Sequence, residues 1–521
     1  MLHPLKKIVV VTLLLAFCLS AVTVLAQEEL ALPIAPPETV ELTYMGSDSW
    51  CPNVSFKDGL PVQTAIEEAT GIKINWDVYS SDLELVIQTR LAAGINLPDI
   101  TEIPPFDSTI GVYRYASNGV LVPLNDLIEE HAPNIQRLFE KYPSLKAACT
   151  SPDGNIYALA GWWGDINEVV PDYIMIRQDW LKKLNLEMPV TPEQWYDTLC
   201  AFRDNDPNGN GEKDEVPVVT LNLLASKFFM TGFGFPTNSD WWLEEGKTVY
   251  YPVDARYKDF LGWLNKLYSE GLISTDIEGS QRQQVVAQDR AGVYCHDPSD
   301  WLVGFDTLCA EANPDCDYVF TPMIRGEGQE EPQLQKRNSI WRYFGITKDC
   351  KNPVEAIKWI DFCYASDQGQ MLYGYGVEGL SYNLVEGKPV FTDLILQNET
   401  YDPFLALRSI GSYPSYLIND PAQAYLDCFK GTKVETVGNE YKGKMVEPFP
   451  TMLGTQEESD LYSEIWPDLQ TYLEEMFINF VTGSESLDNF DSYVQAAYSM
   501  GLDEIIAIKE AQHQRYLDVV Q

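Results

Sequence analysis

Residues 60–103 read LPVQTAIEEATGIKINWDVYSSDLELVIQTRLAAGINLPDITEI. Two apolar helical segments in this stretch, Leu60–Thr70 and Leu83–Ala93, each stop at a glycine, the usual residue after a helix C-terminus. Apolar and polar residues alternate between and before them, as in half-buried strands. We expect strands at Val40–Tyr44, Ile72–Val78 and Pro98–Ile103. Strand–helix–strand–helix–strand order predicts a parallel, doubly wound α/β sheet with helices on both faces.

A second set of α/β elements follows. Tyr173–Arg177 is a short apolar strand, and a helix begins at Asp179. Thr191, Pro192 and Gln194 form the start of a capped helix that runs to about Asp204. Further helices are expected from Tyr257 to Glu270, after an Asn352 cap with Pro353 and Glu355, and over Leu469–Phe480. A chain of 521 residues is too long for one such sheet, so two α/β lobes are predicted.

The N-terminus is typical of an export signal. Residues 1–26 combine Lys6 and Lys7, a short apolar run and a small-residue cleavage site at Ala26, and 27–39 form a proline-containing linker. The protein is therefore expected to be periplasmic or at the cell surface. Leu15-Ala16-Phe17-Cys18 resembles a bacterial lipobox, although Phe17 departs from it, so lipid anchoring at Cys18 is an open alternative.

Charge and cysteine content exclude several classes of protein. Asp plus Glu number 77 against 36 Lys plus Arg, a balance that disfavours binding to nucleic acid. Nine of the ten cysteines lie beyond the signal, and no metal-binding Cys/His cluster is present. Cys309 and Cys316 could close a small disulfide loop, or most cysteines could be buried thiols. A monomer is expected.

The strongest local motif is the acidic loop 206–215, DPNGNGEKDE. Its spacing matches the first half of an EF-hand-type calcium loop, with ligands at alternate positions and a glycine at position 6. Pro217 stands where the last glutamate ligand belongs, and Glu215 could replace it. The predicted structural-calcium ligands are Asp206, Asn208, Asn210, Glu212 through its carbonyl, Asp214 and Glu215. The alternative is a solvated acidic turn.

Catalytic signatures such as HExxH, GxSxG or a P-loop are missing from the sequence. Tryptophans in loops are more informative, because sugar rings stack on indoles while polar groups fix the hydroxyls. Tryptophans inside periodic segments, such as Trp76 and Trp195, are expected in the core instead. The candidate ligand-binding residues are Trp50, Trp162, Trp163, Trp301, Trp341, Arg342, Tyr373 and Glu378.

Several segments resemble the bacterial extracellular solute-binding proteins of carbohydrate ABC importers, in the long branch that includes alginate-binding proteins and lipoprotein-type sugar binders. They are LAAGINLPDI at 91–100, Gly119–Asn134, DGNIYAL at 153–159, IRQDWL at 176–181, Thr191–Pro217, Asn265–Ile273 and Lys351–Gly379.

This resemblance implies a type II periplasmic-binding-protein fold, with two α/β lobes and ligand in the cleft between them. It implies delivery of an oligosaccharide or sugar to membrane permease subunits, no catalysis, and a structural Ca²⁺ in the second lobe. The chain would cross between lobes near Gly161–Tyr173, near Gln333–Trp341 and after about Pro403. Lobe 1 would then comprise 40–171 plus 333–403, and lobe 2 172–332 plus 404–521.

Two rival functions remain compatible with the sequence. An exported glycoside hydrolase or lyase would need a placed acid–base pair, which nothing in the sequence singles out. A sugar-sensing surface protein on the same fold would bind ligand and signal to a membrane receptor.

Overall fold

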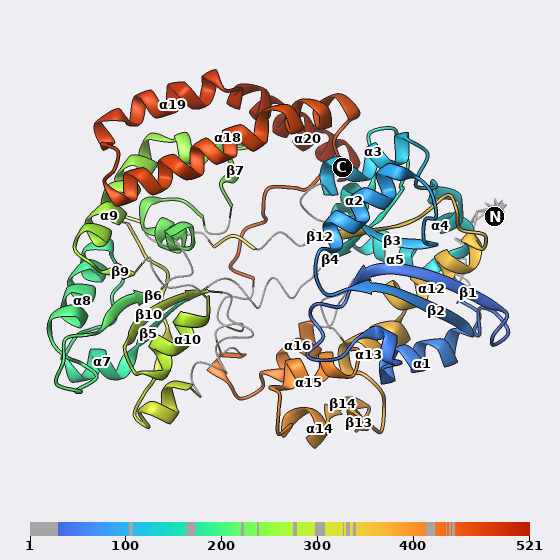
Figure 1. The fold of residues 1–521 in the computed structure, drawn as a ribbon, viewed down its shortest axis with the longest axis horizontal. Helices are drawn as coiled ribbons and strands as arrows, with labels where there is room; N and C mark the ends of the chain where they lie inside the picture. The colour runs from blue at the N-terminus through green and yellow to red at the C-terminus, as the bar shows by residue number, and fades with distance from the viewer. Residues whose placement is uncertain are drawn as a thin grey trace, which may run out of the picture.

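A computed structural model gives the structure of the chain. It describes residues 30–103, 108–162, 173–219, 223–236, 239–274, 279–296, 308–326, 328–329, 334–336, 340–412, 422–433, 435–436, 439 and 443–520. The two predicted α/β lobes are present and lie side by side (Figure 1). No helix among these residues is long and apolar enough to cross a membrane.

The first lobe is built on a five-stranded sheet in the order β2-β1-β3-β12-β4. Its strands are β1 Val40–Ser47, β2 Ile72–Tyr79, β3 Ile100–Ile103, β12 Ile340–Ile346 and β4 Leu159–Trp162. β1 pairs in parallel with β2 and β3, whereas β12 is antiparallel to both of its neighbours. The expected strands and helices between residues 40 and 103 are therefore confirmed.

Helices cover this sheet, and Gly71 and Gly94 end the first two helices in the left-handed conformation. The helices are α1 Pro61–Thr70, α2 Leu83–Ala93, α3 Ser108–Ser117, α4 Asn125–His131, α5 Pro133–Lys141, α6 Pro143–Cys149, α12 Pro353–Ala365, α13 Asp367–Tyr375, α14 Asp393–Leu396, α15 Pro403–Ser409 and α16 Ala422–Cys428, with the short η1 Phe56–Asp58. A hairpin of β13 Tyr382–Val385 and β14 Lys388–Phe391 lies at the periphery.

The second lobe has its own five-stranded sheet, ordered β11-β5-β10-β6-β9. Its strands are β5 Tyr173–Arg177, β6 Val216–Val219, β9 Ile273–Ser274, β10 Ala291–His296 and β11 Tyr318–Phe320. β10, β6 and β9 run parallel, and β5 is antiparallel to β10 and β11.

The elements around this sheet bury a second apolar core. They are α7 Gln178–Lys183, α8 Pro192–Asp204, η4 Leu223–Phe233, the hairpin β7 Trp241–Glu244 and β8 Lys247–Tyr250, η5 Tyr251–Val253, α9 Ala255–Ser269 and α10 Gly279–Ala287. Thr191 and Gln194 form the predicted capping box of α8. At α12, by contrast, the side chain of Asn352 makes no capping hydrogen bond, so the cap predicted there was wrong. The backbone of Asn352 has a ψ of 60°, which departs from the extended conformation typical of a helix N-cap.

The C-terminal helices join the lobes. α18 Gln456–Thr482, η6 Leu487–Asn489, α19 Phe490–Ser499 and α20 Leu502–Val520 follow in succession. Leu469, Leu473, Phe477 and Phe480 form the apolar face expected for α18, and they pack into the core of the second lobe. α20 contacts both α6 of the first lobe and β8 of the second, and the red helices run across both lobes in Figure 1.

Two crossing segments pair beside each other between the lobes. Gln335, in the segment between β11 and β12, bridges Val446 in parallel. Lys336 N donates to Val446 O at 2.9 Å, and Val446 N donates to Leu334 O at 2.8 Å. The third crossing therefore includes Val446, well beyond the predicted position after Pro403.

The helices after Pro403 explain this difference. α15 and α16 pack on α13 and α14, and Phe404, Leu407 and Phe429 belong to the core of the first lobe. Val62 N also donates to Ile410 O at 3.1 Å, which ties this segment to α1. The boundary proposed after residue 403 thus falls before the chain leaves the first lobe.

Candidate functional site

Four of the predicted ligand residues, Trp50, Trp162, Trp341 and Arg342, lie by strand position at one edge of the sheet of the first lobe. β1, β3 and β4 end at this edge, and the antiparallel β12 begins there, with Ile340 opposite Trp162 and Arg342 opposite Gly161. Trp50 follows the end of β1 by three residues. Ligands of open α/β sheets bind outside the carboxyl ends of the strands, so this edge is the candidate site.

A buried carboxylate, that of Glu102, binds two neighbouring side chains at the middle of this edge. Glu102, near the end of β3, is only 2% exposed; it accepts a 3.0 Å hydrogen bond from Tyr44 Oη and pairs through Oε2 with Arg342 Nη1. Burial raises the pKa of Glu102, while Arg342 opposes that rise. A Cβ at Gly46 would collide with the carboxylate of Glu102 and the ring of Tyr44, so glycine suits this position beside the pair.

Sequence reasoning missed Glu102. The available signal was an acidic residue inside a short apolar strand, because a charge that becomes buried is nearly always paired. The predicted ligand residue Arg342 is thus engaged in an ion pair with a buried partner, and its side chain is 15% exposed.

A polar hollow of about 430 Å³ opens where β1 and β2 end. Hydroxyl, amide, amine and carboxylate groups dominate its lining, which comprises Asp48, Ser49, Cys51, Asn53, Val54, Ser55, Lys57, Asp58, Val78 and Ser80. Asp48 is 7% exposed and accepts a 2.5 Å hydrogen bond from Ser55 Oγ. Lys57 Nζ donates to Val78 O at 2.9 Å. The half-buried Trp50 packs beside the hollow, with its ring 5.1 Å from that of Phe56.

The other predicted ligand residues differ in their surroundings. Tyr373, in α13, is 3% exposed within the core of the first lobe, and burial raises the pKa of its hydroxyl. Glu378 is exposed on the turn between α13 and β13. Trp163 and Trp301 lie outside the described residues, and only the backbone of Trp341 is described, within β12.

Trp162 faces a second cavity, which lies by the crossing segments. Its ring is 4.3 Å from that of Tyr142, and its side chain is 8% exposed. The cavity has a volume of about 360 Å³ and is bounded by α6, by residues 447–451 of the crossing segment and by His513 and Tyr516 of α20. Trp162 therefore contributes to packing between the sheet and the C-terminal helix.

The acidic loop 206–215 lies between the end of α8 and the start of β6. Its backbone turns tightly, with Asp206, Gly209 and Gly211 at φ of 40°, 79° and 89°. Asp206 accepts hydrogen bonds from Gly209 N at 2.8 Å and Gly211 N at 3.1 Å. These are the backbone features of a compact oxygen-rich turn.

The donor set of this loop fits a hard divalent cation. Glu215 is 8% exposed, and its Oε2 has no hydrogen-bond partner. Burial raises the pKa of Glu215, and the negative charges of Asp206 and Asp214 raise it further. A cation with oxygen ligands would satisfy the unpartnered oxygen and offset this repulsion.

The carboxylates of Asp206, Asp214 and Glu215 do not form a close cluster in the structure. Among the described residues, the one group of three His, Cys, Asp or Glu side chains with all ligand atoms within 4.8 Å is Asp289, Cys309 and Cys316. Its two sulfurs are bonded to each other, which makes that group a poor metal site. Calcium binding at 206–215 would require Asp206, Asp214 and Glu215 to approach one another.

The loop is far from the candidate ligand edge of its own lobe. It precedes the amino end of β6, whereas ligands of open α/β sheets bind outside the carboxyl ends of the strands. A cation in the loop would therefore act on the stability of the second lobe.

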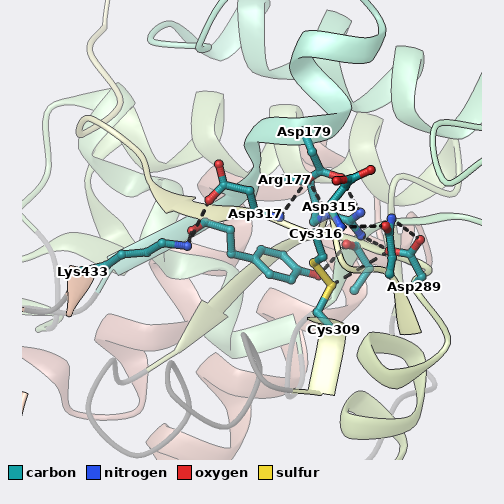
Figure 2. Close-up of a disulfide and its surroundings, with 11 residues drawn as sticks. Arg177, Asp179, Asp289, Cys309, Asp315, Cys316, Asp317 and Lys433 are labelled. Carbon is teal, nitrogen blue, oxygen red and sulfur yellow. Dashed lines mark hydrogen bonds and ion pairs between the residues drawn. A yellow bond between two sulfur atoms is a disulfide. The ribbon is translucent and has the colours of Figure 1, made fainter. Parts of the chain in front are cut away.

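A buried arginine lies beside the disulfide segment (Figure 2). Its partner Asp289 immediately precedes Arg290, which donates to the main-chain oxygen of Asp214 in the acidic loop. Arg177 has a fully buried side chain and pairs with Asp179 at 2.6 Å and Asp289 at 2.5 Å. Cys309 and Cys316 form the disulfide that the sequence left open as one of two alternatives. Six other described cysteines are free thiols: Cys51, Cys149, Cys200, Cys350, Cys363 and Cys428.

Comparison with known proteins identifies related chains. The family model described as bacterial extracellular solute-binding protein matches residues 54–370. The fructooligosaccharide ABC transporter substrate-binding protein FusA of Streptococcus pneumoniae is 26% identical over 485 residues, covering 87% of this chain and 86% of FusA. Lipoprotein LipO of Bacillus subtilis is 24% identical over 87% of this chain and 88% of LipO.

Solved structures agree with these matches. The alginate-binding protein AlgQ2, solved without calcium ion, superposes with a TM-score of 0.76 at 25% identity, covering 93% of this chain and all of AlgQ2. FusA in complex with kestose superposes with a TM-score of 0.73 at 25% identity, covering 92% of this chain and 99% of FusA. FusA has also been solved as an EF-hand mutant.

Proposed function

The chain belongs to the bacterial extracellular solute-binding protein family, and from this premise we propose that it captures an oligosaccharide between its lobes and delivers it to ABC-transporter permease subunits. It is a substrate-binding protein of a carbohydrate ABC transporter, a non-enzymatic component. The hydrolase or lyase alternative is therefore set aside. The sensor alternative shares the binding step, and no observation favours it.

The observation that carries the proposal is the gathering of aromatic and polar groups at the carboxyl edge of the first sheet. Trp50 lies beside a hollow rich in hydroxyl and carboxylate groups, and Trp341 and Arg342 start the strand at the same edge. Such surroundings suit a sugar, which needs apolar platforms for its C–H faces and hydrogen bonds for its hydroxyls. We propose Trp50, Trp163, Trp301 and Trp341 as the stacking platforms.

The crossing segments support a hinged mode of binding. Three connections link the lobes, and two of them pair at Gln335 and Val446. A short paired hinge allows the lobes to rotate as rigid bodies around a ligand. The protein is proposed to act as a monomer and to close when sugar binds.

A structural calcium ion in the loop 206–215 is part of the proposal. Asp206, Asn208, Asn210, Asp214 and Glu215 would supply side-chain oxygens, and Glu212 its carbonyl. The unpartnered Oε2 of Glu215 and the calcium and EF-hand features named for AlgQ2 and FusA support it. Lipid attachment at Cys18 is the alternative to cleavage after Ala26, and the similarity to lipoprotein LipO supports that alternative.

A thermal-shift screen against neutral and charged oligosaccharides tests the function, because a ligand that binds only the folded state raises the melting temperature. Trp50→Ala should weaken binding of a ligand found this way by about 1–3 kcal/mol, as an anchor residue does. Trp195→Ala is the matched control for loss of an indole from the core, since Trp195 is fully buried. That control should lower the melting temperature, whereas Trp50→Ala should chiefly lower affinity.

A further inference from the structure

Two cavities lie at opposite ends of the ligand edge of the first sheet. The polar hollow adjoins the carboxyl ends of β1 and β2, through the segments 48–58 and 78–80. The cavity that Trp162 faces adjoins the carboxyl end of β4 and the start of β12, where Ile340 pairs with Trp162. β3 and β4 are both antiparallel to β12, so all these strand ends share one edge. We call the second space the hinge cavity, because residues 447–451 of the crossing segment line it.

Both lobes and the crossing segment form the walls of the hinge cavity. Trp162 and α6 belong to the first lobe, and Leu243 of β7 belongs to the second. Phe449 of the crossing segment and Tyr516 of α20 add two half-buried aromatic rings. A mainly apolar cavity of about 360 Å³ with such rings suits the C–H face of a sugar ring.

The polar hollow offers the complementary chemistry. Its volume is about 430 Å³, and Asp48 and Ser55 in its lining can accept and donate hydrogen bonds to sugar hydroxyls. Its wall is held from outside the segment, because Asn53 Nδ2 donates to Tyr401 Oη at 3.2 Å. The hollow is therefore a formed site for a polar sugar unit.

The order of the strands sets the distance between the two cavities. In the order β2-β1-β3-β12-β4, the polar hollow lies at the first two strands and the hinge cavity at the last two. Their centres are therefore separated by three strand spacings, or about 14 Å. Each unit of a linear oligosaccharide advances the chain by about one strand spacing, so a ligand needs about four units to reach both cavities.

Arg342 lies between the two cavities on this edge. Its ion pair with Glu102 holds the guanidinium in place, and its side chain is 15% exposed. The path from one cavity to the other thus passes a positioned, charged side chain at its midpoint.

We infer that the ligand is a linear oligosaccharide of about four units or more, with one end in the polar hollow and the other in the hinge cavity. A ligand of this length contacts both lobes and the crossing segment at once, because all three line the hinge cavity. Shorter sugars reach one cavity only. This inference rests on the proposed function and adds to it the length of the ligand and the position of its ends.

Isothermal titration with oligosaccharide series tests the length. The probes are cello-, xylo-, malto-, inulin-type fructo- and galacturono-oligosaccharides of two to six units. In a series that binds, affinity should rise at least tenfold from three to four units and change less than threefold beyond five. A trisaccharide that binds as tightly as the tetrasaccharide of its series would overturn the inference and leave a sugar-binding protein. Absence of binding in every series would overturn the proposed function as well.

Three serine-to-tryptophan variants test the position of the two ends. Ser80→Trp fills the polar hollow, Ser144→Trp fills the hinge cavity, and Ser499→Trp adds the same side chain on α19, outside both linings. All three serines are exposed. Ser80→Trp and Ser144→Trp should each weaken tetrasaccharide binding at least tenfold, and Ser499→Trp should leave it unchanged. Normal tetrasaccharide binding by either cavity variant would overturn the inference.

A change at Phe449 tests the hinge cavity without crowding it. Phe449→Ala should weaken tetrasaccharide binding at least tenfold, whereas Phe449→Tyr, which keeps the ring, should bind as the parent protein does. Thermal unfolding shows that each variant is folded before its affinity is compared. Equal tetrasaccharide affinities for the two folded variants would overturn the inference.

Discussion

Arg290 Nε donates to the main-chain oxygen of Asp214 at 2.8 Å, and the same nitrogen lies 2.8 Å from Oδ2 of the Asp214 carboxylate. The preceding residue, Asp289, pairs with the buried Arg177. Two adjacent residues just before β10 therefore tie the acidic loop to the buried ion pair of the second lobe. A change that orders the loop 206–215 should therefore increase the stability of the second lobe.

Calcium removal should lower the melting temperature. Without the ion, Asp206, Asp214 and the buried Glu215 repel one another, and with it they are held together. A ligand that binds only the folded state stabilises it by an amount set by affinity and free concentration. Scanning calorimetry with chelator, and then with calcium restored, measures the effect.

The double variant Asp206→Ala with Asp214→Ala is the control for the calcium prediction. It should have a melting temperature indifferent to chelator, while sugar affinity changes little. If chelator does not change the melting temperature of the unaltered protein and elemental analysis finds no calcium, residues 206–215 form an ordinary acidic turn.

Removing Arg342 should destabilise the first lobe strongly. Arg342→Met leaves the carboxylate of Glu102 buried without its cation, which costs about 3–5 kcal/mol. Arg342→Met combined with Glu102→Gln should recover most of the loss, because no buried charge remains and Gln can still accept from Tyr44 Oη. Urea unfolding of both variants measures this, and equal stabilities would contradict it.

The interlobe pair of Lys433 and Asp317 should favour the closed arrangement. Lys433 follows α16 of the first lobe, and its Nζ lies 3.1 Å from Oδ1 of Asp317, which precedes β11 of the second (Figure 2). Both side chains are 35% exposed, so the pair contributes less than about 1 kcal/mol. Lys433→Met should weaken sugar binding by less than tenfold and leave the melting temperature unchanged.

Small-angle scattering supplies the structural readout for closure. Saturating sugar should reduce the radius of gyration, and Lys433→Met should raise the sugar concentration needed. Lys182→Met is the matched control, because Lys182 contacts the same aspartate at 3.8 Å from within the second lobe. A scattering profile that sugar does not change would count against a hinged binder.

Loss of the Cys309–Cys316 disulfide should cost about 2–3 kcal/mol, as expected for closing a short loop. The two cysteines are seven positions apart, and Asn313 between them donates to Asp289 Oδ2 at 2.9 Å. The double serine variant should melt earlier than the parent protein without loss of sugar affinity. A reducing agent should lower the melting temperature of the parent and not of the variant.

Asp361 should make stability depend on pH. Burial raises its pKa to about 7, although Ile135 N donates to it at 2.8 Å. The folded state therefore holds a proton that the unfolded state releases near pH 4. Stability from this group is complete below pH 4 and is lost as pH rises towards 7, by a few kcal/mol.

Asp361→Asn removes that titration. Relative to the parent protein, the variant should gain stability as pH rises from 5 to 8, measured by thermal unfolding in buffers of equal ionic strength. A constant difference across this range would contradict a raised pKa for Asp361.

Local pattern predicted the elements of residues 40–103, because their signals lie within a few residues of each other. Gly71 and Gly94 take positive φ at the ends of α1 and α2, which the sequence indicates directly. The two cysteines of the disulfide, and the residues of the capping box at Thr191, are likewise close in sequence, so a local pattern can predict them. Trp195 is fully buried, and Trp76 is half-buried against the core of the first lobe, as expected for tryptophans inside periodic segments.

Long-range packing could not be predicted in this way. Glu102 and Arg342 are 240 residues apart, and no local pattern indicates their ion pair. The sequence around Phe404 and Leu407 does not indicate which lobe's core these residues join. The third crossing between the lobes was therefore predicted too early in the chain. Tyr373 was expected to contact ligand, whereas α13 places its side chain in the core of the first lobe.

Because β12 lies between β3 and β4, the first sheet is completed by a strand that is synthesised long after its neighbours. A chain that passes through a membrane channel from its N-terminal end would arrive with β3 and β4 unjoined. The pairing of β12 with β3 and β4 joins segments that are far apart in sequence, and such long-range strand pairing forms slowly. This delay leaves two open strand edges, which attract other chains until β12 arrives.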